Sequence, residues 1–162
     1  MIVDHAIISY EPTNNFPAIE TFYASVGYFG LIAPSSVVIA ARDGDAIVGA
    51  ARIARENGIL VLRGMMIAPS HQRRGLGTRM LSELDKHIGH SECFCLPHGW
   101  LQHFYGQIGF ATIADDISPS HLWERLNAGR IKYSQLVILK RPENLTKRGD
   151  DLVRPDSVSN GR

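Results

Sequence analysis

The feature that most constrains the fold of this chain is a pair of hairpin turns set between three apolar runs. Asp43-Gly44 separates residues 37–42 from 46–56, and Asn57-Gly58 separates the second run from residues 59–68. Asp-Gly and Asn-Gly suit type I′ hairpin turns, because both central residues of such turns need a positive φ. The three runs are therefore predicted to form an antiparallel meander.

The hydrophobic pattern changes after the third run. Pro69 ends that run, and a helix is predicted from Gly75 to about residue 87 because apolar residues recur there at helical spacing: Leu76, Met80, Leu81, Leu84 and Ile88. Residues 93–96 form a short apolar run that follows. A strand, a helix and a strand in this order favour a right-handed crossover between parallel strands. The remaining patterns predict helices at 17–26, 100–108 and from Ser118-Pro119 to about Gly129, and strands at 5–10, 110–114 and 133–140.

These elements predict an α+β fold with a single mixed, mostly antiparallel sheet and flanking helices. We expect residues 1–140 to form one domain and the polar residues 141–162 to form a disordered tail. Residues 1–140 hold twelve basic and twelve acidic side chains, so the broad cationic face of a nucleic-acid-binding protein is not expected. The sequence has no apolar run long enough to span a membrane and no signal-peptide pattern, which makes the cytoplasm the expected compartment.

The cysteines and histidines give weaker signals. Cys93 and Cys95 lie in an apolar segment, which favours buried reduced thiols, with a redox or metal pair as the alternative. The seven histidines lack the cysteine or carboxylate neighbours that a zinc site needs, so we predict no metal site.

A glycine-rich turn, Gln72-Arg73-Arg74-Gly75-Leu76-Gly77, lies between the end of a predicted strand and the start of a predicted helix. Glycines let the backbone approach a ligand closely, and the free N–H groups at a helix start can bind phosphate oxygens. The turn is therefore a candidate anion-binding cradle. The alternative is a tight turn with two solvated arginines.

Two segments together resemble the GCN5-related N-acetyltransferase (GNAT) superfamily. Residues 65–81, MMIAPSHQRRGLGTRML, are similar to the loop pattern Gln/Arg-x-x-Gly-x-Gly/Ala after the fourth strand of that family. Residues 104–110, FYGQIGF, are similar to its second motif, Phe-Tyr-x-x-x-Gly-Phe. With a weaker likeness at residues 22–28, the resemblance covers roughly residues 5–140. It implies the GNAT-like acyl-CoA N-acyltransferase fold, in which the fourth and fifth strands splay apart, and acetyl-CoA as the cosubstrate.

The resemblance also implies which residues form the site. The backbone of Met65, Met66 and Ile67 would pair with the pantetheine arm. Tyr105 matches the tyrosine that in many members protonates the departing CoA thiolate, whereas its alternative is a tyrosine packed in the core. The pyrophosphate would lie against the turn, which comprises Gln72, Arg73, Arg74, Gly75, Leu76, Gly77 and Thr78.

The sequence departs from the family pattern in two places. Many members carry an acidic general base on the fourth strand, where this chain has Gly64, and the neighbouring Arg63 cannot replace it because a guanidinium keeps its proton. His98 stands where many members have an asparagine. Its imidazole could contact the cofactor or accept the amine proton, and a capped or solvated histidine is the alternative.

The resemblance implies an N-acetyltransferase that moves an acetyl group from acetyl-CoA to a small-molecule amine in a ternary complex. The apolar loop at residues 28–32 and the helix near Leu122, Trp123 and Leu126 are expected either to shape the acceptor pocket or to cover the core. Two other functions stay open: acetylation of a protein or aminoacyl-tRNA amine, and acyl-CoA sensing without turnover. No nucleic-acid or membrane partner is expected, and a homodimer is left open.

Overall fold

The computed structural model describes residues 7–144, and within this range seven strands form one sheet in the order β1-β2-β3-β4-β5-β7-β6. All neighbouring pairs are antiparallel except β4 and β5, which are parallel, so the predicted mixed and mostly antiparallel sheet is confirmed. The strands are β1 (Ile8–Thr13), β2 (Val37–Asp43), β3 (Ala46–Glu56), β4 (Ile59–Ile67), β5 (Cys93–Cys95), β6 (Ala111–Thr112) and β7 (Leu139–Arg141). The helices are α1 (Phe16–Ser25), α2 (Leu76–Ile88), α3 (Gln102–Gly106) and α4 (Ser120–Arg130), with short 3-10 turns at Pro69–His71, Gly99–Leu101 and Asp115–Ile117.

The two hairpin signals produce the meander β2-β3-β4. Asn57 and Gly58 both have positive φ, as the second predicted turn requires. The first turn lies one residue later than predicted, at Gly44-Asp45, because Asp43 pairs with Ala46 as the last residue of β2. The crossover from β4 through α2 to β5 then places β5 parallel to β4, as the order of the sequence patterns predicts.

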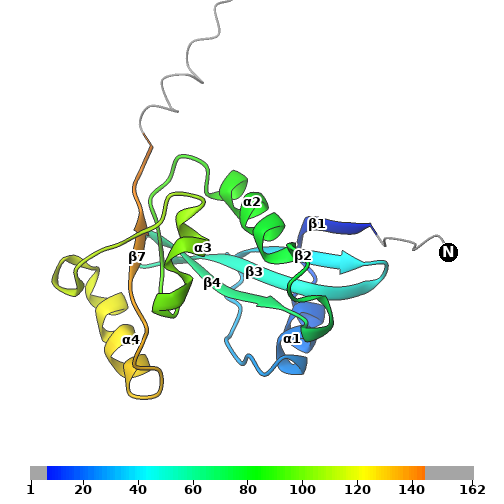
Figure 1. Cartoon of the computed structure of the whole chain (residues 1–162), viewed down its shortest axis with the longest axis horizontal. Helices are drawn as coiled ribbons and strands as arrows, with labels where there is room; N and C mark the ends of the chain where they lie inside the picture. Colours follow the sequence, from blue (N-terminus) through cyan, green and yellow to red (C-terminus); the bar gives the residue numbers. More distant parts are fainter. Residues whose placement is uncertain (1–6, 145–162) are drawn as a thin grey trace, which may run out of the picture.

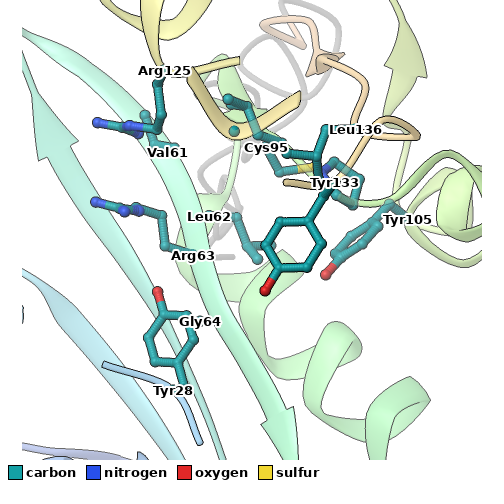
Figure 2. Close-up of a pocket in the computed structure, with 13 residues that line it drawn as sticks. Tyr28, Val61, Leu62, Arg63, Gly64, Cys95, Tyr105, Arg125, Tyr133 and Leu136 are labelled. Atoms are coloured by element: carbon teal, nitrogen blue, oxygen red, sulfur yellow. The ribbon is translucent and has the colours of Figure 1, made fainter. Parts of the chain in front are cut away.

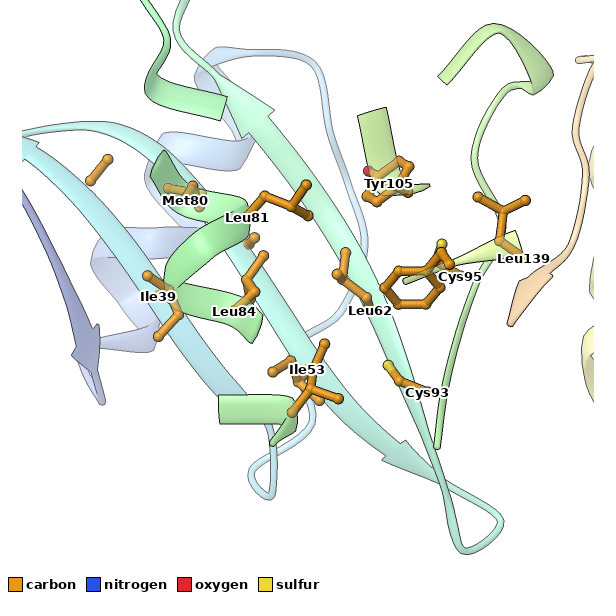
Figure 3. Packing of buried hydrophobic residues seen from close by; sticks show 14 of the residues in the cluster. Ile39, Ile53, Leu62, Met80, Leu81, Leu84, Cys93, Cys95, Tyr105 and Leu139 are labelled. Carbon is orange, nitrogen blue, oxygen red and sulfur yellow. The ribbon is translucent and has the colours of Figure 1, made fainter. Parts of the chain in front are cut away.

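Helices cover both faces of the sheet. Figure 1 shows α2 and α3 on one face and α1 and α4 on the other, with α1 near the β1 edge and α4 near the β7 edge. Side chains of β2 alternate between the two layers, with Ile39 packed in the core under α2 and Val38 in the core against α1. The larger core is the α2 layer, drawn in Figure 3, where Met80, Leu81 and Leu84 of α2 lie over the sheet. On the face opposite α2, α1 and α4 therefore cover different parts of the sheet (Figure 1).

The predicted end of β1 and the predicted start of α4 are wrong. β1 extends to Thr13 rather than ending at residue 10, because it is an edge strand and tolerates Pro12, which has no N–H to donate; residues 5 and 6 lie outside the described residues. Ser118 does not cap α4. Its hydroxyl bonds the carbonyl of Asp115 instead, and α4 begins at Ser120 without a side-chain cap.

The C-terminal part of the sheet also differs from its prediction. The chain from residue 133 to 138 is irregular, because turn bonds such as Leu136 N–H to the Tyr133 carbonyl replace a continuous ladder, and the regular strand is only Leu139–Arg141. Arg141, expected in the tail, is a buried member of β7 whose guanidinium lies 2.7 Å from the Asp85 carboxylate and donates to the Gly89 carbonyl. The predicted disorder of the tail falls on residues 145–162, which lie outside the described residues, and stays a prediction. The strand predicted at residues 110–114 is also shorter in the structure, where β6 covers only Ala111 and Thr112.

Candidate active site

The parallel strands β4 and β5 pair over a short stretch and then separate. Their ladder joins Leu60, Val61 and Leu62 to Cys93, Phe94 and Cys95. From Arg63 onwards β4 has no partner on that side within the described chain, so its backbone edge faces the gap. An unpaired strand edge offers N–H and C=O groups to an extended ligand. The expected splay of the fourth and fifth strands is therefore present.

A bulge in β4 lies beside this gap. Ala50 pairs with Met66 and Arg52 pairs with Arg63, so β4 holds one more residue than β3 between these pairs. Gly64 sits in the bulge with φ +64°, a left-handed conformation that glycine adopts without strain. Its carbonyl accepts a hydrogen bond of 2.8 Å from the Tyr23 hydroxyl of α1.

The glycine-rich turn runs from the end of β4 into α2. Gly75 is the N-cap of α2 in the left-handed conformation, and Arg73 before it also has a positive φ of 61°. The first N–H groups of an α-helix have no partner within the helix, so those at the start of α2 point out of its N-terminus. The Gln72 side chain donates to the Ile67 carbonyl at 3.1 Å and so ties the turn to the end of β4. The side chains of Arg73, Arg74 and Thr78 are exposed.

A cavity of about 360 Å³ lies along the gap between the strands. Figure 2 shows Tyr28, Arg63 and Arg125 on one side of β4, and Tyr105, Tyr133 and Cys95 on the other. The wall of the cavity also includes Val61, Leu62, Gly64, Leu96, Pro97, Gly129 and Leu136.

Tyr105 lines this cavity from α3 while most of its ring is buried. Its side chain packs edge-on against Phe104 at 5.0 Å and Phe110 at 6.1 Å between ring centroids. Burial raises the pKa of Tyr105 well above its ordinary value, and the nearby Cys95 adds to the effect. The hydroxyl therefore stays protonated over the physiological pH range and can act as a donor.

His98 is held by aromatic contacts rather than presented to the cavity. Its ring stacks on Trp100 with 4.3 Å between centroids and an angle of 7° between planes, and it meets Tyr133 edge-on at 5.4 Å. His98 is not among the residues that line the cavity, although its neighbour Pro97 is. The structure thus brings Tyr105 to the cavity and leaves His98 behind Tyr133.

The two cysteines are free and buried, which confirms the prediction of reduced core thiols. Burial raises the pKa of Cys93 to about 12 and raises that of Cys95 as well. A thiol of high pKa is a poor nucleophile, so neither cysteine is a candidate for covalent catalysis.

No carboxylate of the described residues lines the cavity. Glu56, at the end of β3, is held by Arg63 at 3.0 Å and Arg125 at 2.7 Å. Burial alone would raise the pKa of Glu56, but the hydrogen bonds and positive charges of Arg125 and Arg63 bring it below its ordinary value. Glu56 is therefore a weak base that links α4 to the sheet.

Several residues of the cavity were not predicted from the sequence. Tyr133, Arg125 and Gly129 reach it from α4 and the segment after it, and only their place in three dimensions reveals this. Of the two alternatives for the helix near Leu122 and Leu126, these two side chains take the core, where both are fully buried, whereas Arg125 and Gly129 of the same helix line the cavity. Tyr28, from the loop expected to shape the pocket, does line the cavity.

The described residues contain no helix with the length and apolar character needed to cross a membrane. Nor do residues 7–144 bring three or more histidine, cysteine or acidic side chains together as a metal ion would require.

Comparison with known proteins agrees with this geometry. Residues 34–112 match the family model described as Acetyltransferase (GNAT) domain. No curated protein sequence matches the chain.

Solved structures with the same fold share little sequence with the chain. Escherichia coli ElaA superposes with a TM-score of 0.63 at 14% identity, over 83% of this chain and 99% of that protein. The ribosomal-protein-S18-alanine N-acetyltransferase of Escherichia coli gives a TM-score of 0.58 at 13% identity, over 85% and 95% of the two chains. N-acetylglutamate synthase from Neisseria gonorrhoeae, crystallised with coenzyme A and L-arginine, gives 0.59 at 18% identity, over 86% of this chain but 34% of that one. Residues 34–112 therefore match a GNAT acetyltransferase domain, and the chain has the fold of the GNAT acyl-CoA N-acyltransferase structures.

Proposed function

We propose that the protein transfers an acetyl group from acetyl-CoA to the amine of a small acceptor by direct attack in a ternary complex. The observation that carries the proposal is the open edge of β4 beyond Leu62, which runs from the cavity at Gly64 towards the glycine-rich turn that begins α2; the turn itself does not line the cavity. Tyr105 lines the cavity beside Leu62 and Gly64 of β4, which supports its proposed place next to the reacting end of the cofactor.

The donor would lie along β4. The N–H groups at the start of α2, from Leu76 to Thr78, suit pyrophosphate oxygens, and the exposed Arg73 and Arg74 add positive charge beside them. The backbone of Met65, Met66 and Ile67 would pair with the pantetheine arm, and Gln72 would hold the turn in place through its bond to Ile67. A strand N–H would then hold the thioester oxygen.

In the chemical step, the neutral amine nitrogen attacks the thioester carbon and a C–N bond forms. The C–S bond breaks as the tetrahedral intermediate collapses, and the sulfur takes the proton of the Tyr105 hydroxyl. The ammonium proton leaves to water, and Tyr105 regains a proton from solvent, so the products are an amide and the CoA thiol. The raised pKa of Tyr105 keeps the donor form populated before each turnover.

The general base that many family members use is missing here, because Gly64 stands in its place. We propose that the acceptor loses its proton to water, with His98 as the alternative base. The contacts of His98 with Trp100 and Tyr133 support the first route, since they place its ring outside the cavity lining.

The experiment is steady-state release of CoA from acetyl-CoA in the presence of a panel of amines, with Tyr105→Phe compared with the parent. Removing an acid used in the transition state should lower kcat by about 10² to 10⁴ with little change in the affinity for acetyl-CoA. Tyr10→Phe is the matched control, because Tyr10 lies on β1 and does not line the cavity. A Tyr105→Phe kcat within twofold of the parent, with chemistry rate-limiting, would refute the role of Tyr105. CoA release that no amine accelerates would refute acetyl transfer.

A further inference from the structure

Arg52 is a charged side chain that the core encloses without giving it a counter-charge. It lies at the middle of β3 and is 1% exposed. Its two terminal guanidinium nitrogens make no hydrogen bond of good geometry among the described residues, although the Tyr23 hydroxyl lies near enough to interact with the charge. A guanidinium keeps its charge in proteins, and a buried charge is costly unless it is paired. An arginine at this position therefore needs a reason beyond stability.

The Arg52 side chain lies between two tyrosine rings and two glycines. The guanidinium carbon lies 5.7 Å from the ring centroid of Tyr23 and 5.4 Å from that of Tyr28, which are cation–π distances. A Cβ atom at Gly64 would lie 2.7 Å from one terminal nitrogen, and a Cβ atom at Gly30 would lie 2.9 Å from the other. At Gly64 the positive φ and this crowding both favour glycine, and at Gly30 an added Cβ would also meet the Tyr28 side chain at 2.7 Å. Each nitrogen therefore lies close to a glycine backbone.

This arrangement adjoins the cavity on the acceptor side. Gly64 and Tyr28 both line the cavity, and Arg52 pairs across the sheet with Arg63, which lines it too. Tyr23 and Tyr28 belong to the α1 layer of the core, whereas the pyrophosphate turn opens α2 on the other face. The free cation of Arg52 is thus remote from the phosphate-binding end of the site.

The other arginines of this side are already paired. Arg63 and Arg125 share the carboxylate of Glu56, whereas no carboxylate is paired with Arg52 in the described chain. A guanidinium whose terminal nitrogens have no carboxylate partner can bind both oxygens of a carboxylate, which is a strong mode of arginine recognition.

We propose that Arg52 is the specificity-determining residue for the acceptor and binds a carboxylate, which makes the acceptor class amino acids. This inference rests on the proposed acetyl transfer. The acceptor carboxylate reaches the guanidinium when Tyr28 moves aside. The covering segment can move without breaking the sheet, because residues 29–35 make no backbone hydrogen bond to a strand or helix of the described chain.

The test measures binding of products rather than turnover. N-acetyl derivatives of alanine, leucine, phenylalanine and glutamate are each compared with their carboxamides by calorimetry, in the presence of CoA. For at least one side chain, the acid should bind the parent at least tenfold more tightly than the amide. Arg52→Met should abolish this difference, and Arg52→Lys should keep part of it, because lysine retains the charge but loses the fork. The control is Arg55→Met, which removes the same charge from an exposed position of the same strand.

Acids and amides that bind the parent equally across the panel, or a preference for acids that survives in Arg52→Met, would overturn the inference. Amine-dependent CoA release separates this result from the proposed function. If amines without a carboxylate are acetylated as well as amino acids, the carboxylate inference fails and acetyl transfer stands. If acids bind selectively through Arg52 but no amine is acetylated, the proposed function fails and the carboxylate site stands.

Discussion

Gly64→Ala is expected to be the most destabilising single-methyl change in the site. At φ +64° an alanine side chain costs about 1 kcal/mol in backbone strain. Its Cβ would lie 2.5 Å from the Tyr23 hydroxyl oxygen and 2.7 Å from an Arg52 nitrogen, and relieving such overpacking costs about 1 to 3 kcal/mol. Moving Tyr23 also weakens its 2.8 Å bond to the Gly64 carbonyl, worth about 1 kcal/mol. The sum is a loss of about 3 to 5 kcal/mol in the free energy of unfolding.

Urea denaturation followed by circular dichroism measures this loss as a lower midpoint at unchanged slope. Gly58→Ala is the matched control. Gly58 has φ +81°, and no heavy atom lies within 4 Å of where an added Cβ would sit, so only the backbone cost of about 1 kcal/mol applies. Equal losses in the two variants, within about 0.5 kcal/mol, would refute the crowding at Gly64. Confirmation would predict that a carboxylate side chain at residue 64 is also poorly tolerated.

Three further outcomes are expected. Gly77→Glu should weaken acetyl-CoA binding at least about tenfold by placing a like charge at the pyrophosphate, whereas Ser82→Glu, on the exposed face of the same helix, should not; equal calorimetric affinities would contradict this. Because the pKa of Glu56 is lowered in the folded state, ionised Glu56 should stabilise the fold above its ordinary pKa of 4.5. This stabilisation should be lost as the pH falls through the folded pKa. The melting temperature of Glu56→Gln should lack this part of the pH dependence. The acidic limb of kcat/KM should follow the acceptor's own titration, and a limb fixed at about pH 6 to 7 that disappears in His98→Ala would make His98 the base instead.

Local patterns in the sequence carry most of the fold. The two Asp-Gly and Asn-Gly turns predict the meander, and the change of hydrophobic period after Pro69 predicts the β4-α2-β5 crossover, because both depend on residues close in the chain. The boundaries of β1 and β7 depend on neighbours far away in sequence. The edge position of β1 permits Pro12 within the strand. A turn hydrogen bond from Leu136 N–H to the Tyr133 carbonyl replaces strand pairing, so β7 begins only at Leu139.

The site divides in the same way. The glycine turn and the Tyr105 motif are contiguous segments, so sequence reasoning reaches them, and their proposed roles stay predictions. Tyr133 and Arg125 come to the cavity from separate segments, and nothing in their local sequence marks them, whereas Tyr28 belongs to an apolar loop that sequence already made a candidate. Arg52 looks like an ordinary alternating strand residue until its burial and its missing partner are seen.

The missing base and the unpaired cation have one structural origin. Residue 64 is a glycine in a left-handed bulge, so it lacks the side chain that the family pattern uses to accept a proton. The same lack of a Cβ leaves room for the Arg52 guanidinium beside it. A positive charge near an ammonium group lowers the pKa of that group, because like charges disfavour the charged form. Under the two proposals, Arg52 would hold the acceptor carboxylate and offset the negative charge that would otherwise stabilise the ammonium. Loss of the amine proton to water would then need no carboxylate in the site, so under these proposals a chain with glycine at this position would still acetylate an amine.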